Sequence, residues 1–371
     1  MTKILLTTGG TGGHIYPIMS LYLKLKKNEQ IKDIKIFTDE RAKKFISIKD
    51  IKIIKSDSPF RKRGIVHLLK TIIYIFISTL KCVYFLIIFK PKIIIGSGGY
   101  VSIPVLFASF ILRKKFILYE TNSVLGRVNK LFLPFCKKLL SGYSQINNFP
   151  KKYKQKFFYT GQLVRNEFLD LANNIYKKKN NTNSKDKILN VLILGGSQGA
   201  KVFGEKLPKC FKNLDHKTIK ISLKQQVQKD QLNNIKEFYK NNVKFEVHLF
   251  EFHKNIQNYI IDSDIVICRS GSSTIAELSI LNKPFIAIPL PSSLDNHQYF
   301  NAKHYYDKNC CWLLDEKSED FELKMNNILK DIYSSDVLLT TKQNNLIELN
   351  KKNAIDNFLE HILENNGFTL K

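Results

Sequence analysis

The sequence predicts an α/β protein built from two Rossmann-like, doubly wound domains that face each other across a cleft. Short apolar runs, typical of buried parallel strands, alternate with helical stretches along most of the chain. Three of these runs end in a glycine-rich turn, at residues 9–13, 96–99 and 195–199. The length of 371 residues also suits two domains better than one core. We expect the cleft at the carboxyl ends of the strands.

The elements follow one another in βαβ order. Apolar runs predict strands at residues 3–8, 34–38, 93–96, 116–119, 190–195, 218–223, 244–250, 264–268 and 284–289. Helical patterns lie between them, for example at residues 15–27, 201–213, 228–240, 273–281 and 296–308. Residues 173–187 are polar and low in complexity, which predicts a surface loop before the second domain. After residue 318 the chain is polar and helical, without a further glycine-rich turn.

The composition limits the classes of possible binding partner but does not identify a single class. The net charge is +27, from 59 basic and 32 acidic residues, which would attract nucleic acid, anionic lipid or phosphorylated substrates. The lysines are scattered over every segment, as compositional drift also produces, and no nucleic-acid recognition motif is present, so we expect no nucleic-acid partner. The six cysteines form no CxxC pair, which predicts a reducing compartment with neither disulfides nor a zinc site. The start Met-Thr-Lys leads directly into a strand, so no secretory signal peptide is expected.

The glycine-rich turns indicate phosphate binding. Several glycines let backbone N–H groups approach a phosphate, and the following helix directs its positive end at the same anion. Two such turns lie in the first half of the chain and one in the second. This distribution predicts two phosphate-bearing ligands, and hence a group-transfer enzyme.

The second half carries a further candidate site. Residues 269–273 form a turn between a strand and a helix, where N–H groups could hold a diphosphate. Glu277, one helical turn after Ser273, is placed to accept both hydroxyls of a ribose, or it is simply a solvated helix residue. Asp295 and Gln298 fit a capping box, although the Gln298 amide would equally serve a ligand.

Residues 65–89 form a strongly apolar helical segment that follows Arg61, Lys62 and Arg63. A narrow polar stripe is expected along it from His67, Lys70, Tyr74, Ser78 and Lys81. The longest charge-free run, residues 71–80, is shorter than the roughly 20 residues that span a bilayer. The helix is therefore expected either in the core or partly on a membrane surface.

Six sequence blocks resemble the MurG family in their order. They are GGTGGHIYP at 9–17, GSGGYVSIP at 96–104, ETNSVLGRVNK at 120–130, GGSQGA at 195–200, CRSGSSTIAEL at 268–278 and DNHQYFNA at 295–302. The chain departs from the family pattern at Thr121, where glutamine is usual, and at Gln162-Leu163, which replace Asn-Pro. The family segment His-Gln-[Ser/Thr]-Gly is not recognisable in residues 221–226.

The resemblance implies a GT-B glycosyltransferase that moves N-acetylglucosamine from UDP-N-acetylglucosamine to lipid I. Lipid I is undecaprenyl-diphosphate-linked muramyl-pentapeptide, and the product is lipid II. By this resemblance, residues 1–163 form the acceptor domain, residues 164–342 bind the donor, and a helix at about 343–371 packs back on the first domain. A peripheral position on the cytoplasmic face of the bacterial cell membrane, against anionic lipid, is also implied.

The resemblance also assigns roles to single residues. Donor binding falls to Thr11, Gly12, Gly13, Asn122, Arg165, Ser197, Glu277 and Gln298. Ser197 is expected at the diphosphate, Glu277 at the ribose, and Gln298 and Asn122 at the sugar. The acceptor diphosphate is expected at Gly9, Gly10, Gly98, Gly99 and Tyr100.

The expected reaction is attack of the C4 hydroxyl of the acceptor on the anomeric carbon, with inversion. His14 is the candidate base, although a histidine that only orders the loop or binds acceptor phosphate remains an alternative, and Glu120 is the reserve. Arg165 and the glycine-loop amides would stabilise the departing UDP, so neither a metal nor a cofactor is expected. A UDP-N-acetylglucosamine 2-epimerase or a transferase to another lipid acceptor, such as diacylglycerol, shares this donor chemistry.

Overall fold

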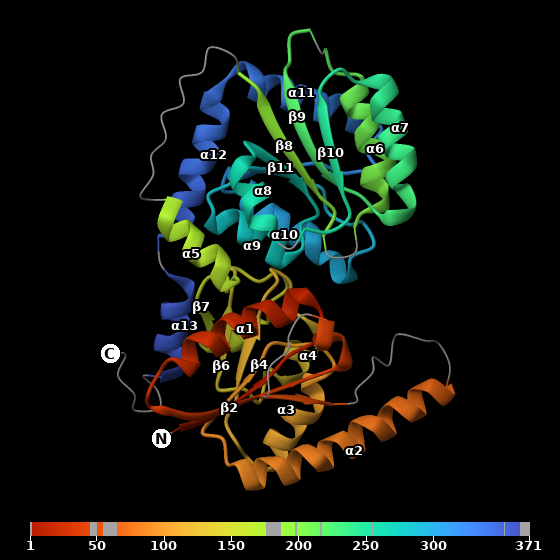
Figure 1. Ribbon diagram of the computed structural model, residues 1–371. Coiled ribbons are helices and arrows are strands. Elements are labelled where there is room, and N and C mark those ends of the chain that lie inside the picture. Colours follow the sequence, from red (N-terminus) through yellow and green to blue (C-terminus); the bar gives the residue numbers. More distant parts are fainter. Residues whose placement is uncertain are drawn as a thin grey trace. The chain divides into compact units, whose positions relative to one another are not determined.

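The computed structural model describes residues 2–44, 50–54, 65–175, 187–196, 199–215, 217–253, 255–351 and 353–363. The chain forms two compact units (Figure 1). The N-terminal unit comprises Met1–Arg165 and Lys352–Lys371, and the C-terminal unit comprises Asn166–Lys351. Each unit has one parallel sheet with helices on both faces, so the prediction of two Rossmann-like domains is confirmed.

The sheet of the N-terminal unit has the order β3-β2-β1-β4-β5-β6-β7. Its strands are β1 (Thr2–Thr7), β2 (Ile31–Thr38), β3 (Ile51–Ile53), β4 (Ile93–Gly96), β5 (Ile117–Glu120), β6 (Lys138–Ser141) and β7 (Phe157–Tyr159). The chain begins at β1, builds outward to β3 and then returns to add β4 on the other side of β1. The neighbours β1 and β4 thus form a topological switch point, where ligands of such sheets bind.

The α-helices in the described residues of this unit cover the two faces of the sheet: α1 (Gly12–Lys26), α2 (Ile65–Phe89), α3 (Ser102–Ile111), α4 (Arg127–Phe132) and α13 (Ala354–Leu363). Successive side chains of a strand point to opposite faces. Accordingly, Ile4 and Leu6 pack in one core cluster with α1 and α13, and Leu5 packs in another with α2, α3 and α4.

The sheet of the C-terminal unit has the order β10-β9-β8-β11-β12-β13. Its strands are β8 (Leu189–Leu194), β9 (Ile221–Gln226), β10 (Glu246–Phe250), β11 (Ile265–Cys268), β12 (Phe285–Ala287) and β13 (Cys311–Leu313). Its α-helices are α5 (Asn166–Ile175), α6 (Lys201–Lys212), α7 (Leu232–Asn242), α8 (Ile256–Asp262), α9 (Ser272–Ile280), α10 (His297–Tyr306), α11 (Phe321–Ser334) and α12 (Asp336–Leu349). Here β8 and β11 are the neighbours at the switch point.

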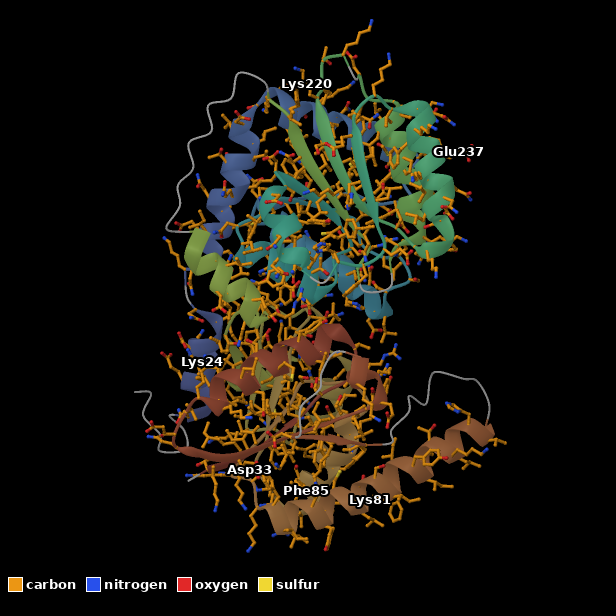
Figure 2. The ribbon with its side chains drawn as sticks, viewed as in Figure 1. Lys24, Asp33, Lys81, Phe85, Lys220 and Glu237 are labelled. Carbon is orange, nitrogen blue, oxygen red and sulfur yellow. The ribbon has the colours of Figure 1, made fainter. Side chains whose placement is uncertain are left out.

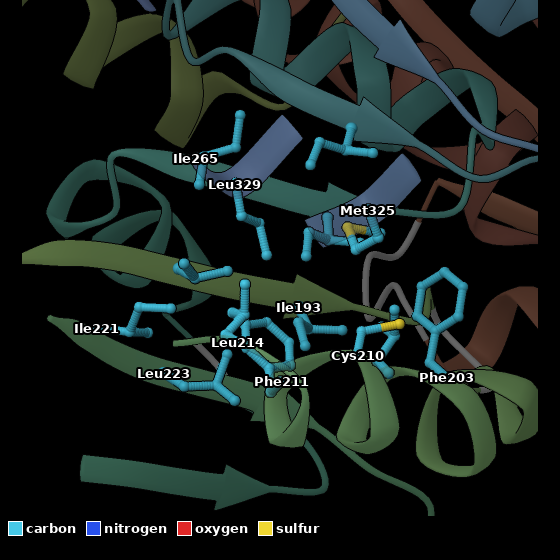
Figure 3. Close-up of a cluster of buried hydrophobic side chains, with 14 of the residues drawn as sticks. Ile193, Phe203, Cys210, Phe211, Leu214, Ile221, Leu223, Ile265, Met325 and Leu329 are labelled. Atoms are coloured by element: carbon cyan, nitrogen blue, oxygen red, sulfur yellow. The ribbon is translucent and has the colours of Figure 1, made fainter. Parts of the chain in front are cut away.

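One core cluster lies between this sheet and helices α6, α7 and α11. Ile193 and Ile265 of the sheet pack with Cys210 and Phe211 of α6 and with Met325 of α11 (Figure 3). All of these side chains are fully buried. Their packing holds the last turn of α6 against the sheet.

The structure adds strands that the sequence analysis missed. These are β3, β6, β7 and β13, each only three or four residues long. Strand β9 covers Ile221–Gln226 rather than residues 218–223, and along it buried Ile221 and Leu223 alternate with the partly exposed Ser222 and Lys224. Such alternation gives no continuous apolar run to detect.

The chain passes between the units at slightly different residues from those expected. Leu163 and Val164 are buried in the N-terminal unit, and the Leu163 N–H donates to the Tyr119 hydroxyl at 3.0 Å. The unit therefore extends to Arg165. Helix α5 reaches Ile175, inside the predicted loop, and residues 176–186 lie outside the described part.

The expected helix at about 343–371 is two segments. Residues up to Leu349 belong to α12 of the C-terminal unit, where Asn350 Nδ2 donates to the Ser279 carbonyl at 2.7 Å. Only α13 packs on the N-terminal sheet. There the Phe358 ring stands edge-on to Tyr119, with ring centroids 5.1 Å apart.

Candidate functional site

Two glycine-rich loops meet at the carboxyl edge of the N-terminal sheet, where β1 and β4 are neighbours. Gly98 and Gly99 have φ angles of +79° and +76°, which residues with side chains rarely adopt. A Cβ at Gly99 would lie 2.9 Å from the Cα of Gly9. A Cβ at Gly10 would lie 2.0 Å from Oδ1 of Asp39. The loops therefore touch through their backbones, and glycine is required by the available space.

His14 lies in the first turn of α1, at the contact of the two loops. Its Nδ1 is 3.0 Å from the carbonyl oxygen of Ser97 in the second loop. Because a carbonyl oxygen only accepts, Nδ1 of the neutral ring carries the proton and Nε2 keeps its lone pair. Thr8 Oγ1 donates to the His14 carbonyl at 3.0 Å and accepts from Ser97 Oγ at 2.8 Å. The hydrogen bond to Ser97 thus leaves Nε2 as the basic nitrogen of the ring.

The start of α1 lies at the surface, where Thr11 and Gly13 are exposed. The helix begins at Gly12, and Thr11 before it has extended backbone angles. The first N–H groups of a helix have no partner within that helix and carry its positive end. A Cβ at Gly13 would meet no atom within 4 Å. Tyr100, after the second loop, is half-buried and packs on the core cluster beneath it.

Glu120 ends β5 and is only 2% exposed. Its Oε1 accepts from the Asn122 N–H at 3.0 Å, and its Oε2 accepts from the Gly126 N–H and from Asn129 Nδ2, each at 2.8 Å. Burial raises the pKa of Glu120, and these hydrogen bonds oppose the shift. With both oxygens occupied and almost no exposed surface, Glu120 holds the loop at 121–129. This geometry argues against its reserve role as a base.

Two further predicted donor contacts, Asn122 and Arg165, belong to the N-terminal unit. Asn122 is half-buried, and its Nδ2 donates to Thr121 Oγ1 at 3.3 Å. Gln162 Nε2 donates to the Thr121 carbonyl at 3.0 Å, so two departures from the family pattern are in contact. The Arg165 guanidinium stands 4.8 Å from the ring centre of Tyr16 on α1. Arg165 is therefore held beside the helix that carries His14.

The third glycine-rich loop lies at the carboxyl edge of the C-terminal sheet. Gly196 and Gly199 have φ angles of +83° and +69°. The Gly195 N–H donates to Gln226 Oε1 at 3.1 Å, and a Cβ at Gly195 would lie 2.3 Å from the Ala200 nitrogen. Ser197, the expected diphosphate contact, lies outside the described residues. Gln226 supports this loop from the segment where the family pattern was not recognisable.

Helix α9 follows β11, the strand that lies next to β8 in the sheet. A turn at residues 269–271 connects β11 to this helix. Gly271 precedes its first residue, Ser272, with extended backbone angles. Glu277 is 8% exposed, so the solvated alternative for this residue is wrong. The turn and the third glycine loop share the switch point of the sheet. Both are therefore placed for one phosphate-bearing ligand.

The predicted capping box at Asp295 and Gln298 is not formed. Asp295 and Asn296 both have left-handed backbones, with φ of 52° and 55°, and α10 begins only at His297. Gln298 Oε1 instead accepts from the Leu290 N–H at 3.0 Å. The amide thus orders the loop after β12, and Gln298 remains partly exposed.

The described residues contain no group of three or more histidine, cysteine, aspartate or glutamate side chains that could hold a metal ion. Asp262 and Asp264 flank Ser263 in the manner of a diphosphate–metal motif, but they precede β11. They therefore lie at the amino end of the strand, opposite the glycine loops. Asp264 Oδ2 accepts there from the Asn190 N–H at 2.7 Å.

Helix α2 packs on α3 and the sheet through a side with small residues. Thr71, Ser78, Thr79 and Cys82 are buried there, and Leu86 and Phe89 join the core near the helix end. The expected polar stripe is therefore wrong in part, because Ser78 faces the protein. Burial raises the pKa of Cys82 to about 12.

The other side of α2 is apolar and exposed. The described segment Leu69–Phe89 is long and apolar enough to cross a membrane. The short charge-free run alone therefore does not exclude a membrane-spanning helix. Figure 2 shows Lys81 and Phe85, one turn apart on this helix. Exposed apolar side chains of α2 are Val66, Leu69, Ile72, Ile73, Tyr74, Phe76, Ile77, Leu80, Tyr84, Ile87 and Ile88. We call this surface the α2 face.

The α2 face continues onto neighbouring segments of the same unit. Phe110 of α3 and Phe135, which follows α4, are half exposed, with ring centroids 4.6 Å apart. Exposed basic residues stand beside them in the sequence, namely Arg113, Lys115, Lys130 and Lys137. Arg61, Lys62 and Arg63, the predicted basic flank, lie outside the described residues.

Both halves of the chain match one glycosyltransferase family. Residues 4–141 match the glycosyltransferase family 28 N-terminal domain, and residues 190–358 match the family's C-terminal domain. A relative from Rickettsia canadensis is 37% identical over 368 residues, which are 98% of this chain and 100% of the relative. A relative from Rickettsia felis is 37% identical over 347 residues, 93% of this chain and 94% of the relative. Both are named UDP-N-acetylglucosamine--N-acetylmuramyl-(pentapeptide) pyrophosphoryl-undecaprenol N-acetylglucosamine transferase.

Solved structures share the fold along nearly the whole chain. Acinetobacter baumannii MurG has a TM-score of 0.76 and 22% identity, covering 97% of this chain and 99% of its own. A UDP-GlcNAc 2-epimerase from Neisseria meningitidis, bound to UDP-GlcNAc, has a TM-score of 0.66 and 14% identity, covering 96% and 98%. At these identities the likeness concerns the fold, and function must be argued from sites and relatives.

The role of Glu120 predicts the effect of Glu120→Gln on stability. The new amide NH2 would face N–H donors in place of one carboxylate oxygen, which costs about 1–3 kcal/mol of unfolding free energy. Urea unfolding of both proteins measures this cost. Glu40→Gln, at a side chain that is 65% exposed, is the control and should change stability by less than about 0.5 kcal/mol. Equal stability of Glu120→Gln and its parent would contradict the assigned role.

Proposed function

Because the chain belongs to the family of UDP-N-acetylglucosamine--N-acetylmuramyl-(pentapeptide) pyrophosphoryl-undecaprenol N-acetylglucosamine transferases, we propose that it converts lipid I to lipid II. It transfers N-acetylglucosamine from UDP-N-acetylglucosamine to the C4 hydroxyl of the muramyl sugar, in peptidoglycan synthesis. The observation that carries this proposal is the 37% identity to a relative that is matched along its full length. The epimerase alternative is weaker, because it rests on a fold likeness at 14% identity.

The donor binds the C-terminal unit in this proposal. The third glycine loop, with Ser197, and the start of α9 bind the diphosphate through N–H groups. Glu277 accepts the ribose hydroxyls, and Gln298 contacts the sugar. The common position of these loops at the switch point of one sheet supports the assignment.

The acceptor and the base belong to the N-terminal unit. The loops at Gly9-Gly10 and Gly98-Gly99 bind the acceptor diphosphate, with Tyr100 beside them. Thr11, Gly12, Gly13 and Asn122 meet the donor sugar. His14 Nε2 is the base, and the hydrogen bond of Nδ1 to the Ser97 carbonyl supports this tautomer.

The transfer is a single displacement. The acceptor C4 oxygen forms a bond to the anomeric carbon, whose bond to the β-phosphate oxygen of UDP breaks with inversion. The proton of the hydroxyl passes to His14 Nε2, and UDP leaves with the electron pair. Backbone N–H groups and the Arg165 guanidinium stabilise the charge that develops on UDP.

The protein is also proposed to be peripheral on the cytoplasmic face of the membrane, held by the α2 face. Isolated exposed apolar residues are common on proteins, but a contiguous apolar surface of this extent indicates an interaction site. The buried side of α2 belongs to the core of the N-terminal unit, which supports contact with the membrane surface rather than a span. The exposed basic residues around it suit anionic lipid.

Incubation with radiolabelled UDP-N-acetylglucosamine and a short-chain lipid I analogue tests the activity. We expect labelled lipid II only when both substrates are present, since the transfer joins them. Isomerisation of the donor without an acceptor would establish the epimerase instead. Label transfer to diacylglycerol but not to the lipid I analogue would replace the acceptor in the proposal.

The role of His14 is tested with two variants. In His14→Asn the amide NH2 retains a donor near the Ser97 carbonyl, whereas neither His14→Asn nor His14→Gln has a base at the Nε2 position. Turnover should fall about 10²–10⁴-fold in both variants, with unchanged affinity for UDP measured by calorimetry. Near-normal turnover with a raised acceptor KM would make His14 a binding residue.

The α2 face is tested with Ile73→Ser/Phe76→Ser, at side chains that are 54% and 63% exposed. Flotation with anionic vesicles should weaken for this variant, and parent binding should fall in high salt, because each placed cation contributes roughly 1 kcal/mol. The matched control is Leu323→Ser/Val337→Ser, at exposed residues of the C-terminal unit. Flotation of the α2 variant equal to that of the parent, with intact circular dichroism, would assign membrane binding to another surface.

A further inference from the structure

A buried arginine lies beneath the proposed donor site. Arg269 directly follows β11 and precedes the turn at Ser270, yet it is only 6% exposed. Its Nη1 donates to the carbonyl oxygens of Ile288 and Pro289, at 3.2 Å and 3.1 Å. These two residues directly follow β12. One guanidinium therefore joins the carboxyl ends of two neighbouring strands.

The same guanidinium reaches two further segments. Its Nη1 is 2.6 Å from Oε2 of Glu316, which follows β13, and both side chains are less than a tenth exposed. Its centre lies 4.7 Å from the ring centre of Phe203. Phe203 is in the first turn of α6, directly after the third glycine loop (Figure 3). Arg269 thus contacts the chain after β8, β12 and β13 as well as its own turn.

The physical properties of this pair favour a supporting role over ligand binding. A buried cation is costly unless it is paired and hydrogen-bonded, and Arg269 meets both conditions through Glu316 and two carbonyls. Its charge is therefore compensated inside the protein. The planar guanidinium also offers several fixed donors, which a lysine ammonium does not reproduce.

We propose that Arg269, held by Glu316, is a positioning residue for the donor site. It fixes the turn at Ser270–Ser272 relative to the loop that begins at Leu290. The Leu290 N–H donates to Gln298 Oε1, so a displacement of Pro289 would also displace Gln298. The inference rests on the proposed function in assigning these loops to the donor.

The test compares Arg269→Met with the double variant Arg269→Met/Glu316→Leu. The single variant leaves Glu316 buried and unpaired, so it should lose thermal stability and bind UDP about tenfold more weakly. The double variant removes both charges and should regain most of the stability. Its affinity for UDP should stay low, because the Ile288 and Pro289 carbonyls still lack their donor. Arg269→Lys retains a charge for Glu316 and should fold with a similarly weakened affinity.

Lys283→Met is the matched control. Lys283, a half-buried residue before β12, donates from Nζ to the carbonyls of Ile261 and Ser263, which precede β11. Burial lowers its pKa. This variant should lose stability while its dissociation constant for UDP stays within about twofold of the parent.

Two results would overturn the positioning role. Recovery of UDP affinity together with stability in the double variant would make the pair structural only. Tighter UDP binding by Glu316→Gln would make Arg269 a diphosphate ligand that Glu316 restrains. If the parent binds no UDP, the proposed function fails instead. In that case, amide hydrogen exchange of the free protein tests the positioning role of Arg269. Faster exchange at residues 270–273 and 290–298 in Arg269→Met than in Lys283→Met would support this role. Equal exchange rates in the two variants would contradict it.

Discussion

At each switch point the chain leaves two neighbouring parallel strands toward opposite faces of the sheet, so the loops after both strands begin side by side at its carboxyl edge. Both units depend on this constraint. In the N-terminal unit it brings Gly99 so close to Gly9 that a Cβ would lie 2.9 Å from the backbone. In the C-terminal unit the close approach lies within one loop, where a Cβ at Gly195 would lie 2.3 Å from the Ala200 nitrogen. Where side chains are excluded, backbone N–H groups and helix starts form the surface, so the geometry of the fold also creates the anion-binding edge.

Beneath each edge a buried charged group organises the loops, with opposite chemistry in the two units. Glu120 accepts from the N–H groups of the loop that follows β5, whereas Arg269 donates to carbonyls after β12. A carboxylate collects backbone donors, and a guanidinium collects backbone acceptors. Each group replaces hydrogen bonds that irregular backbone cannot make within a helix or sheet. Both side chains are buried, at 2% exposed for Glu120 and 6% for Arg269.

The sequence predicted the parts of this arrangement that depend on local pattern. Strands β1, β4, β8 and β11 were recognised from apolar runs that end in glycine or polar turns, and these are the strands of the two switch points. The turn that contains Arg269 was also recognised. Its partner Glu316 lies 47 positions later in the numbering, beyond the reach of any local pattern.

Other predictions failed because tertiary structure overrode the pattern. Asp295 and Gln298 have the spacing of a capping box, but the left-handed backbone at Asp295 and Asn296 delays the helix start. Gln225 is polar in sequence yet fully buried, since it accepts from the Tyr239 hydroxyl at 2.6 Å. A buried polar residue with a distant partner interrupts the apolar period by which strands are recognised.

Some of the many lysines stabilise the fold. Lys156 Nζ donates to the carbonyls of Leu133, Pro134 and Cys136, and so caps the chain after α4. Lys187, Lys283 and Lys342 bond to carbonyls at the ends of other elements, and Lys342 is 6% exposed. In a lysine-rich chain these ammonium groups supply donors to carbonyls that have no partner within a helix or sheet. Some of the basic side chains that give the net charge of +27 therefore stabilise the fold. The basic residues beside the α2 face are exposed and can contact a ligand. For membrane binding, their position therefore matters more than the total charge.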